Sequence, residues 1–282
     1  MRRLLPLLLV LTGLPILLVT ALLLAANTPP GQDFIARQIG PLSGGLVRIE
    51  GLTGQLPLAP RLAHLAISDT DGVWLVIEEL ALDLNPWPLW RGRIQVEALT
   101  AGTLALERLP DYPKSEETSS PFQLPPLALR HLAIQQVTLG QVAPEAPPIS
   151  VTGQGTLTSL DDLEAQIAIK APDRADGYQL TFSASPDELR LDLNIHEDPE
   201  GLISALLRHQ GVQLPPEVDR WRLVAQGAGP LEALALRAEL AAGPLQANAD
   251  GLFDLRAQAA SHLKLGAELP ALALALPDGA TL

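Results

Sequence analysis

Histidine is the side chain in this sequence that could most readily bind a metal or move a proton near neutral pH. The five histidines are spread along the chain, at His64, His131, His196, His209 and His262. No two of them stand at a spacing that metal-binding pairs use. The sequence also contains no G-x-S-x-G, H-E-x-x-H or P-loop pattern. We therefore expect solvent-facing histidines that bind no metal and take part in no catalysis.

Three short polar motifs remain, and each has a simpler structural interpretation. Asp69-Thr70-Asp71-Gly72 begins like a calcium loop, but the ligand series stops after two carboxylates, so a hairpin turn explains it better. Gly153-Gln154-Gly155 lacks the third glycine and the following helix of a nucleotide site. Asp161-Asp162 is most simply a solvated turn. The sequence predicts no enzyme and no cofactor.

Composition excludes further classes of protein. With 19 basic and 32 acidic residues the net charge is −13, and no basic stripe is present that could bind nucleic acid. The absence of cysteine excludes disulfides and thiolate-ligated zinc. Hydrophobic residues make up 47% of the chain but aromatic residues only 4%, so its apolar surfaces must be mainly aliphatic. Such surfaces suit flexible hydrocarbon better than flat rings.

The N-terminal segment predicts a membrane anchor over residues 1–27. Arg2 and Arg3 precede an uncharged run from 4 to 26, which as a helix would be about 34 Å long and could cross a ~30 Å hydrocarbon core. The two arginines place the N-terminus in the cytoplasm and the bulk of the chain on the other side. The alternatives are a cleaved signal peptide and a buried core helix. The residues expected to contact lipid are Leu4, Leu8, Leu11, Ile16 and Leu22.

After the anchor, the sequence predicts a short amphipathic segment and then a long sheet. Residues 28–44 offer Phe34, Ile35 and Ile39 at helical spacing near the membrane surface. From Leu46 onward apolar and polar residues alternate, most clearly over residues 189–196. The same alternation occurs in Leu180-Phe182-Ala184, Leu234-Leu236-Ala238, Leu245-Ala247-Ala249 and Phe253-Leu255-Ala257. These segments predict half-buried strands, apolar on one face and wet on the other.

The connections predict how the strands are ordered. Most are short and rich in Gly, Asp and Pro, which joins antiparallel neighbours, so we expect an antiparallel meander of roughly fourteen strands. A first sheet unit spans 45–110, a loop or linker spans 111–126, and the sheet continues over 127–282. A helical insertion is expected near 198–210, where Asp and Glu precede Leu202, Ala205 and Leu206. The chain is therefore all-β with a few short helices.

The apolar face of this sheet is the candidate functional surface. It must be covered by another sheet, curl upon itself, or be offered to a ligand. Residues that alternation places on this face, and that would line a hydrophobic groove, are Ile167, Leu180, Phe182, Leu189, Leu191, Leu193, Ile195, Leu223 and Leu255. The alternation alone leaves open a self-filled sandwich and an aliphatic groove.

The order of motifs behind the N-terminal segment resembles a known family. The resemblance is strongest over residues 1–110 and includes Gly45-Leu46-Val47-Arg48-Ile49-Glu50-Gly51, Leu65-Ala66-Ile67-Ser68-Asp69, Leu80-Ala81-Leu82-Asp83-Leu84-Asn85-Pro86 and Leu89-Trp90-Arg91-Gly92-Arg93-Ile94. His196-Glu197-Asp198-Pro199-Glu200-Gly201-Leu202 extends it. Together these segments are similar to the N-terminal part of the TamB family, the inner-membrane subunit of the translocation and assembly module and a relative of AsmA-like proteins.

This resemblance implies an elongated β-taco, a curled sheet with a hydrophobic groove. It implies an envelope protein that sits in the cell inner membrane with its bulk in the periplasm. Such proteins are thought to conduct phospholipids between the inner and outer membranes and to support outer-membrane protein assembly with a TamA-like barrel. Family members are far longer, and their partner-binding C-terminal domain has no counterpart here. At ~4.8 Å per strand, fourteen strands reach only about 67 Å.

Two functions from different classes follow as expectations. The first is a phospholipid conduit in which acyl chains lie against the apolar face of the sheet. The alternative is a non-catalytic periplasmic scaffold that pairs its strand edge with client or partner β-strands.

Overall fold

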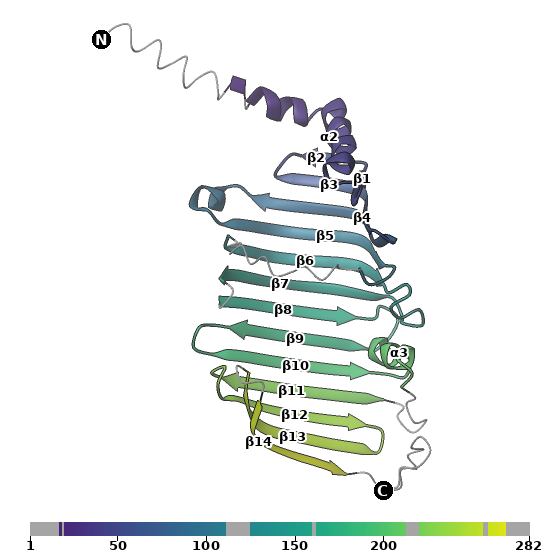
Figure 1. Ribbon diagram of the computed structural model, residues 1–282, viewed down its shortest axis with the longest axis vertical. Coiled ribbons are helices and arrows are strands. Elements are labelled where there is room, and N and C mark those ends of the chain that lie inside the picture. Colours follow the sequence, from purple (N-terminus) through teal and green to yellow (C-terminus); the bar gives the residue numbers. More distant parts are fainter. Residues whose placement is uncertain are drawn as a thin grey trace, which may run out of the picture.

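The computed structural model describes residues 17–18, 20–110, 125–159, 162–212, 220–255 and 259–268. Within these ranges nearly all regular structure belongs to one open sheet, seen as a ladder of strands in Figure 1. Besides the helical residues 20–26, the helical elements are α2 (Pro29–Leu42), the 3₁₀ helix η1 (Trp87–Arg91) and α3 (Leu202–His209). The fourteen strands are β1 (Val47–Glu50), β2 (Thr53–Gln55), β3 (Ala59–Asp69), β4 (Gly72–Asn85), β5 (Ile94–Leu106), β6 (Leu127–Thr138), β7 (Ile149–Ser159), β8 (Asp162–Lys170), β9 (Gly177–Ala184), β10 (Leu189–Glu197), β11 (Trp221–Gly229), β12 (Leu234–Ala242), β13 (Leu245–Asp254) and β14 (Ala259–Glu268).

The strands follow one another through the sheet almost in chain order. The path runs from β1 through β3 to β14 in sequence, and β2 pairs with β3 off this path. Neighbours from β6 onward are antiparallel and joined by connections that mostly suit hairpins, as the Gly, Asp and Pro turns predicted. Among the described strands β1 and β14 lie at opposite ends of the path, so the sheet is open.

One pair departs from the predicted antiparallel meander. β5 and β6 are parallel, with Ile94 opposite Leu127 and Leu104 opposite Val137. A parallel pair needs a connection that returns the chain to the same end of the sheet, and residues 107–126 are long enough to do so. The predicted linker at 111–126 falls within this connection, although its residues 111–124 lie outside the described ranges.

Register keeps the alternation of neighbouring strands in phase over much of the sheet. Residues directly opposite each other in a sheet share a face. One row of partners across β8 to β13 reads Ile167, Leu180, Leu193, Ala225, Ala238 and Ala249. The adjacent row on the other side reads Gln166, Thr181, Asp192, Gln226, Arg237 and Asp250. We name the two sides of the sheet that contain these rows the apolar face and the polar face.

A residue of β4 with an unusual backbone leaves the pairing frame on either side of it intact, and the register shift between β4 and β5 falls later, between Asp83 and Leu84. Glu79 has a left-handed backbone, with φ of 54°. Opposite it stands Gly102, where a Cβ would lie 2.8 Å from the Glu79 carboxylate. On either side, Glu78 pairs with Thr103 and Ala81 with Thr100, so the strands return to the same frame. Ile77 consequently lies opposite Leu104, and Leu82 lies opposite Leu99.

The buried core is small and lies toward one end of the strands. Val137, Ile149 and Ala171 form its centre, and Leu202 of α3 packs against it together with Ile169. Figure 1 shows α3 beside the ends of β9 and β10, with most of the sheet left without a covering helix. The helix lies inside the predicted insertion at 198–210 but begins later, at Leu202.

The N-terminal region is only partly described. Residues 20–26 are helical, and α2 follows after Thr28, whose hydroxyl caps the helix by accepting from the Gly31 N–H at 3.3 Å. α2 extends the predicted amphipathic turn to a full helix. No helix within the described ranges has the length and apolarity needed to cross a membrane. Of the predicted anchor residues, Leu22 lies in the described helix and is 61% exposed, whereas Leu4, Leu8, Leu11 and Ile16 lie outside the described residues.

Candidate functional site

The apolar face gathers all but one of the residues predicted to line a groove. β8 supplies Ile167, β9 supplies Leu180 and Phe182, and β11 supplies Leu223. β10 lies between β9 and β11, and its Leu189, Leu191, Leu193 and Ile195 complete the set. Register places Phe182 opposite Leu191, and Ile195 opposite Leu223. These residues therefore form one continuous aliphatic surface across four strands.

Leu255 is the exception. The alternation Phe253-Leu255-Ala257 predicted a strand through this residue, but β13 ends at Asp254. Leu255 lies in the turn that follows and is 45% exposed. The strand predicted through Leu255 is therefore wrong at this residue, because apolar alternation in the sequence continues beyond the end of β13, and its role in lining a groove stays a prediction.

Side chains on the apolar face are less exposed than those on the polar face, but most of them are not fully buried. Along β10, Leu189, Leu191 and Leu193 are half-buried, whereas Arg190 and Asp192 are exposed. Only Ile195, near the end covered by α3, is fully buried among the groove residues of β10. The aliphatic side chains are thus shielded by their neighbours in the sheet, and no second sheet within the described ranges packs upon them.

Further along the sheet the apolar face carries smaller side chains. The row that holds Leu193 continues into Ala225, Ala238 and Ala249, and the row that holds Leu191 continues into Gly227. Sequence analysis placed Ala238 and Ala249 on strands but did not include them among the lining residues. The same period-two alternation could have identified them. In the row that holds Leu193, the side chains from β11 to β13 are therefore smaller than those from β8 to β10.

An open hollow lies along β8 to β13 and is lined by residues of both faces. It has a volume of about 740 Å³, and its lining includes Phe182, Leu191, Gly227 and Leu236 as well as Arg190, Asp192, Gln226, Arg237 and Asp250. The Gln226 amide donates to Asp192 at 3.1 Å, and Arg237 pairs with Glu239 at 2.9 Å. The charged side chains that line the hollow are exposed to water. The hollow therefore combines exposed charged groups with part of the aliphatic surface, including the predicted groove residues Phe182 and Leu191.

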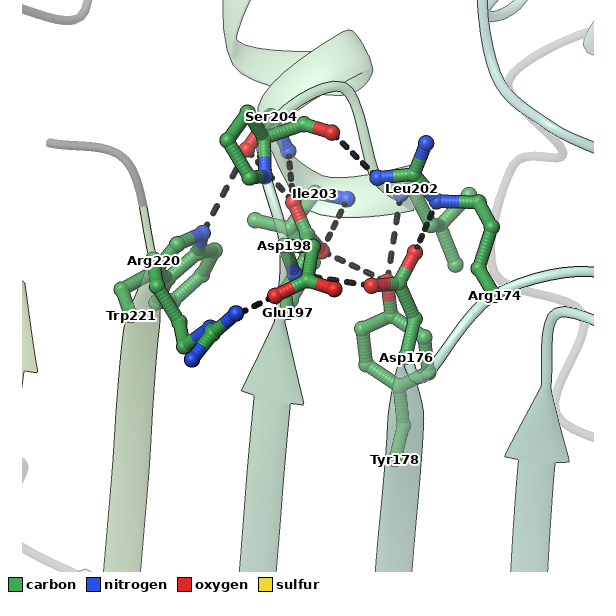
Figure 2. A network of polar contacts seen from close by, with 11 residues as sticks. Arg174, Asp176, Tyr178, Glu197, Asp198, Leu202, Ile203, Ser204, Arg220 and Trp221 are labelled. Carbon is green, nitrogen blue, oxygen red and sulfur yellow. Dashed lines mark hydrogen bonds and ion pairs between the residues drawn. The ribbon is translucent and has the colours of Figure 1, made fainter.

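A buried polar cluster ties α3 to the ends of β9, β10 and β11 (Figure 2). Glu197, the last residue of β10, is 1% exposed. One carboxylate oxygen accepts from the Tyr178 hydroxyl at 2.6 Å and from the Ile203 N–H at 2.9 Å. The other accepts from the Ser204 N–H at 2.8 Å and from the Ser204 hydroxyl. A strand carboxylate therefore caps the first turn of α3, where N–H groups have no partner within the helix.

The remaining donors of the cluster are also satisfied. The Leu202 N–H donates to the Tyr178 hydroxyl oxygen at 3.1 Å, and the Trp221 indole N–H donates to the Ser204 hydroxyl at 3.3 Å. Burial, and after it the hydrogen bond to Glu197, raises the pKa of Tyr178 above its ordinary value. A phenol held neutral in this way is a hydrogen-bond donor rather than a reactive group, so the cluster is structural.

A second layer of ion pairs closes the loop between β10 and α3. Asp176 accepts from the Arg174 guanidinium and from the Asp198 N–H, each at 2.7 Å, and Asp198 accepts from Arg220 at 2.7 Å. The hydrogen bond to Asp176 raises the pKa of Arg174. The segment beginning at His196 that carried part of the family resemblance is therefore a helix-docking loop. Its acidic start was predicted, but the burial of Glu197 was not.

The other polar motifs singled out in the sequence lie apart from one another. His64, His131 and His196 lie in β3, β6 and β10, and His209 ends α3. Among the described residues no group of His, Cys, Asp or Glu is arranged to hold a metal ion. Asp69-Thr70-Asp71-Gly72 forms the turn between β3 and β4, where Arg108 pairs with Asp69. Gly153 and Gly155 lie within β7 and face Ile167 and Ala165 of β8.

Comparison with protein-family models, with curated proteins and with solved structures found no significant match.

Proposed function

We propose that this chain binds the acyl chains of phospholipids along the apolar face and conducts them between the inner and outer membranes. The observation that carries the proposal is the in-phase register of β8 to β13. It joins the apolar positions of successive strands into continuous rows, while leaving side chains such as Leu191 and Leu193 only half-buried. Because these side chains are only half-buried, part of the apolar surface stays accessible, and hydrocarbon chains can cover it.

The energetics suit reversible binding. Apolar contact contributes roughly 25 cal/mol per Å² removed from water, less the cost of ordering the lipid. Because this contribution is non-directional, an acyl chain can slide from one row to the next without breaking specific bonds. The smaller residues Ala225, Ala238 and Ala249 would give it space, and the polar head group would remain at the open side of the groove. In this proposal the sheet curls around the lipid as a β-taco.

Membrane attachment is part of the same proposal. Residues 1–27 would anchor the chain once in the inner membrane, with the N-terminus cytoplasmic and the sheet in the periplasm. The described part of this segment supports the idea, because Leu22 and Leu24 lie in a helix and are 61% and 67% exposed. As the resemblance to the TamB family implies, the chain would also support outer-membrane protein assembly, with a TamA-like barrel as partner.

Native mass spectrometry of the full chain, purified from a bacterial host in mild detergent, tests lipid binding. The informative variant is Leu193→Asp, which places a charge in the middle of the apolar face. Its matched control is Asn194→Asp, which places the same charge one residue away on the polar face. We expect co-purified phospholipids on the wild type and the control, and their loss from Leu193→Asp.

The opposite results are equally clear. A folded wild-type chain without lipid, or equal lipid on both variants, would show that the apolar face is filled by protein. Far-UV circular dichroism of each variant separates loss of lipid from loss of the sheet.

A second candidate function is a scaffold that pairs with client strands, and β14 favours it. Within the described ranges β14 has a neighbour on one side only. An unpaired strand edge can accept another strand. Successive residues direct their N–H groups to opposite edges, so Lys264→Pro and Leu265→Pro should differ in effect. If the scaffold function holds, the variant that removes an outward N–H loses client binding and keeps its lipid.

A further inference from the structure

The turn between β4 and β5 exposes an unusual amount of aromatic surface. It contains η1, in which Trp87 is 79% exposed, Trp90 is 87% exposed and Leu89 is 46% exposed. These are two of the four tryptophans of the chain. Large apolar side chains exposed together on a soluble surface indicate an interaction site. Tryptophan in particular is enriched where protein meets the boundary between lipid and water.

The turn is held rigidly in this exposed state. The Asn85 side chain accepts from the Trp87 N–H at 3.1 Å. Gly92 ends η1 in a left-handed conformation, φ 68°, and its N–H donates to the Leu89 carbonyl at 3.0 Å. The Arg93 N–H donates to the Pro88 carbonyl at 3.1 Å. The tryptophans therefore remain exposed on an ordered frame, which limits the entropy lost when they bind.

The same turn carries positive charge in a chain of net charge −13. Arg91 and Arg93 are both exposed. Neither guanidinium forms a hydrogen bond or ion pair with another side chain that the structure describes. Both line an open hollow of about 840 Å³ beside the turn, together with Trp87 and Trp90 from η1 and Thr156 and Thr158 from β7. Guanidinium groups with hydroxyls nearby suit a phosphate.

From these observations we infer that η1 binds the surface of a membrane that contains anionic phospholipid. Trp87, Leu89 and Trp90 enter the interface between head groups and acyl chains, and Arg91 and Arg93 bind phosphate groups. Each arginine is attracted to the negative potential of an anionic surface, and the indole rings add apolar burial. The pairing of aromatic and basic side chains favours lipid over an apolar protein surface, which would leave the arginines unpaired.

The position of the turn agrees with this assignment. In Figure 1 it joins β4 and β5 at the left of the sheet, toward the end where α2 and the helical residues 20–26 lie. One membrane could therefore receive both the N-terminal helix and η1. The inference does not require the apolar face to carry lipid, since it concerns a different surface of the sheet.

Quenching of tryptophan fluorescence by brominated lipid tests the inference directly. The protein is the full chain with Trp74→Phe and Trp221→Phe, reconstituted into vesicles of brominated phosphatidylcholine with or without phosphatidylglycerol. All tryptophan fluorescence of this variant then comes from Trp87 and Trp90. Because residues 1–28 contain no tryptophan, insertion of that segment alone produces no quenching.

We expect strong quenching and a blue-shifted emission maximum, both greater with phosphatidylglycerol present. Adding Arg91→Gln and Arg93→Gln should remove the increase that phosphatidylglycerol causes and leave the signal in pure phosphatidylcholine unchanged. The reciprocal control, Trp87→Phe with Trp90→Phe, leaves Trp74 and Trp221 as reporters, which should be quenched at least roughly twofold less, because both are half-buried in the sheet.

Equal quenching of the two tryptophan pairs would overturn the inference, as would emission from Trp87 and Trp90 that brominated lipid leaves unchanged. Flotation of the same vesicles reports reconstitution independently. A chain that floats with lipid but shows no quenching of Trp87 and Trp90 is attached by another segment.

Discussion

The hydroxyl of Tyr178 in β9 donates a 2.6 Å hydrogen bond to Glu197 at the end of β10, and this carboxylate caps α3. A strand side chain thus supplies the acceptors that the helix cannot supply for itself. Because Glu197 is 1% exposed, its charge is stabilised almost entirely by these donors. The pair joins α3 to the sheet on which it packs.

Removing the carboxylate should detach this helix. Glu197→Ala leaves Tyr178, Ile203 and Ser204 without their acceptor, and buried donors without partners are costly. We expect the free energy of unfolding to fall by about 2–4 kcal/mol in urea titrations followed by circular dichroism. Glu188→Ala removes an exposed ion pair with Arg190, which water screens, and should lower the free energy of unfolding far less than Glu197→Ala does. Equal losses in both variants would show that α3 is held by its apolar contacts.

Tyr178 should resist ionisation in alkaline solution. Its pKa is raised, chiefly by burial, so the folded state holds a proton that the unfolded state releases near pH ~10. The stability that this proton provides is complete below that pH and declines as the pH rises further. The chain has two tyrosines, so absorbance at the tyrosinate band of wild type and Tyr178→Phe isolates the signal of Tyr178.

The native difference spectrum should lack a tyrosinate transition near pH ~10. The stability difference between wild type and Tyr178→Phe should also narrow above that pH. A full transition at the ordinary phenol value, with α3 intact by circular dichroism, would contradict the buried geometry.

Local alternation was sufficient to predict the strands and their two faces, because side chains alternate with a period of two in any strand. It placed Leu189 to Ile195 correctly on one side of β10. It could not predict the parallel pairing of β5 and β6, since strand direction depends on the path of residues 107–126 and leaves no mark on alternation. The role of Glu197 was also hidden, because a carboxylate at a strand end resembles a solvated turn until the helix above it is known.

Glycines on the apolar face should differ in what they tolerate. A Cβ at Gly153 would lie 2.8 Å from the Gln166 carbonyl oxygen, which is backbone and cannot move freely. At Gly227 the nearest atom would be a methyl carbon of Leu236 at 3.4 Å, an ordinary contact. We expect Gly153→Ala to lower the free energy of unfolding by about 1–3 kcal/mol and Gly227→Ala to leave it nearly unchanged. Urea titration of both variants would measure the difference, and similar losses would indicate that the register of β7 and β8 relaxes easily.

The small residues of β12 and β13 provide a test of groove volume that adds no charge. Ala238→Trp fills the row in which Ala225 and Ala249 lie opposite, on the apolar face. Ala235→Trp adds the same side chain to β12 on the polar face. If acyl chains occupy the apolar face, Ala238→Trp should reduce the number of phospholipids seen by native mass spectrometry, and Ala235→Trp should not. An indole ring at Ala238 must displace any acyl chain that lies over Ala225, Ala238 and Ala249. Equal numbers of bound phospholipids in the two variants would therefore mean that lipid does not lie over this row.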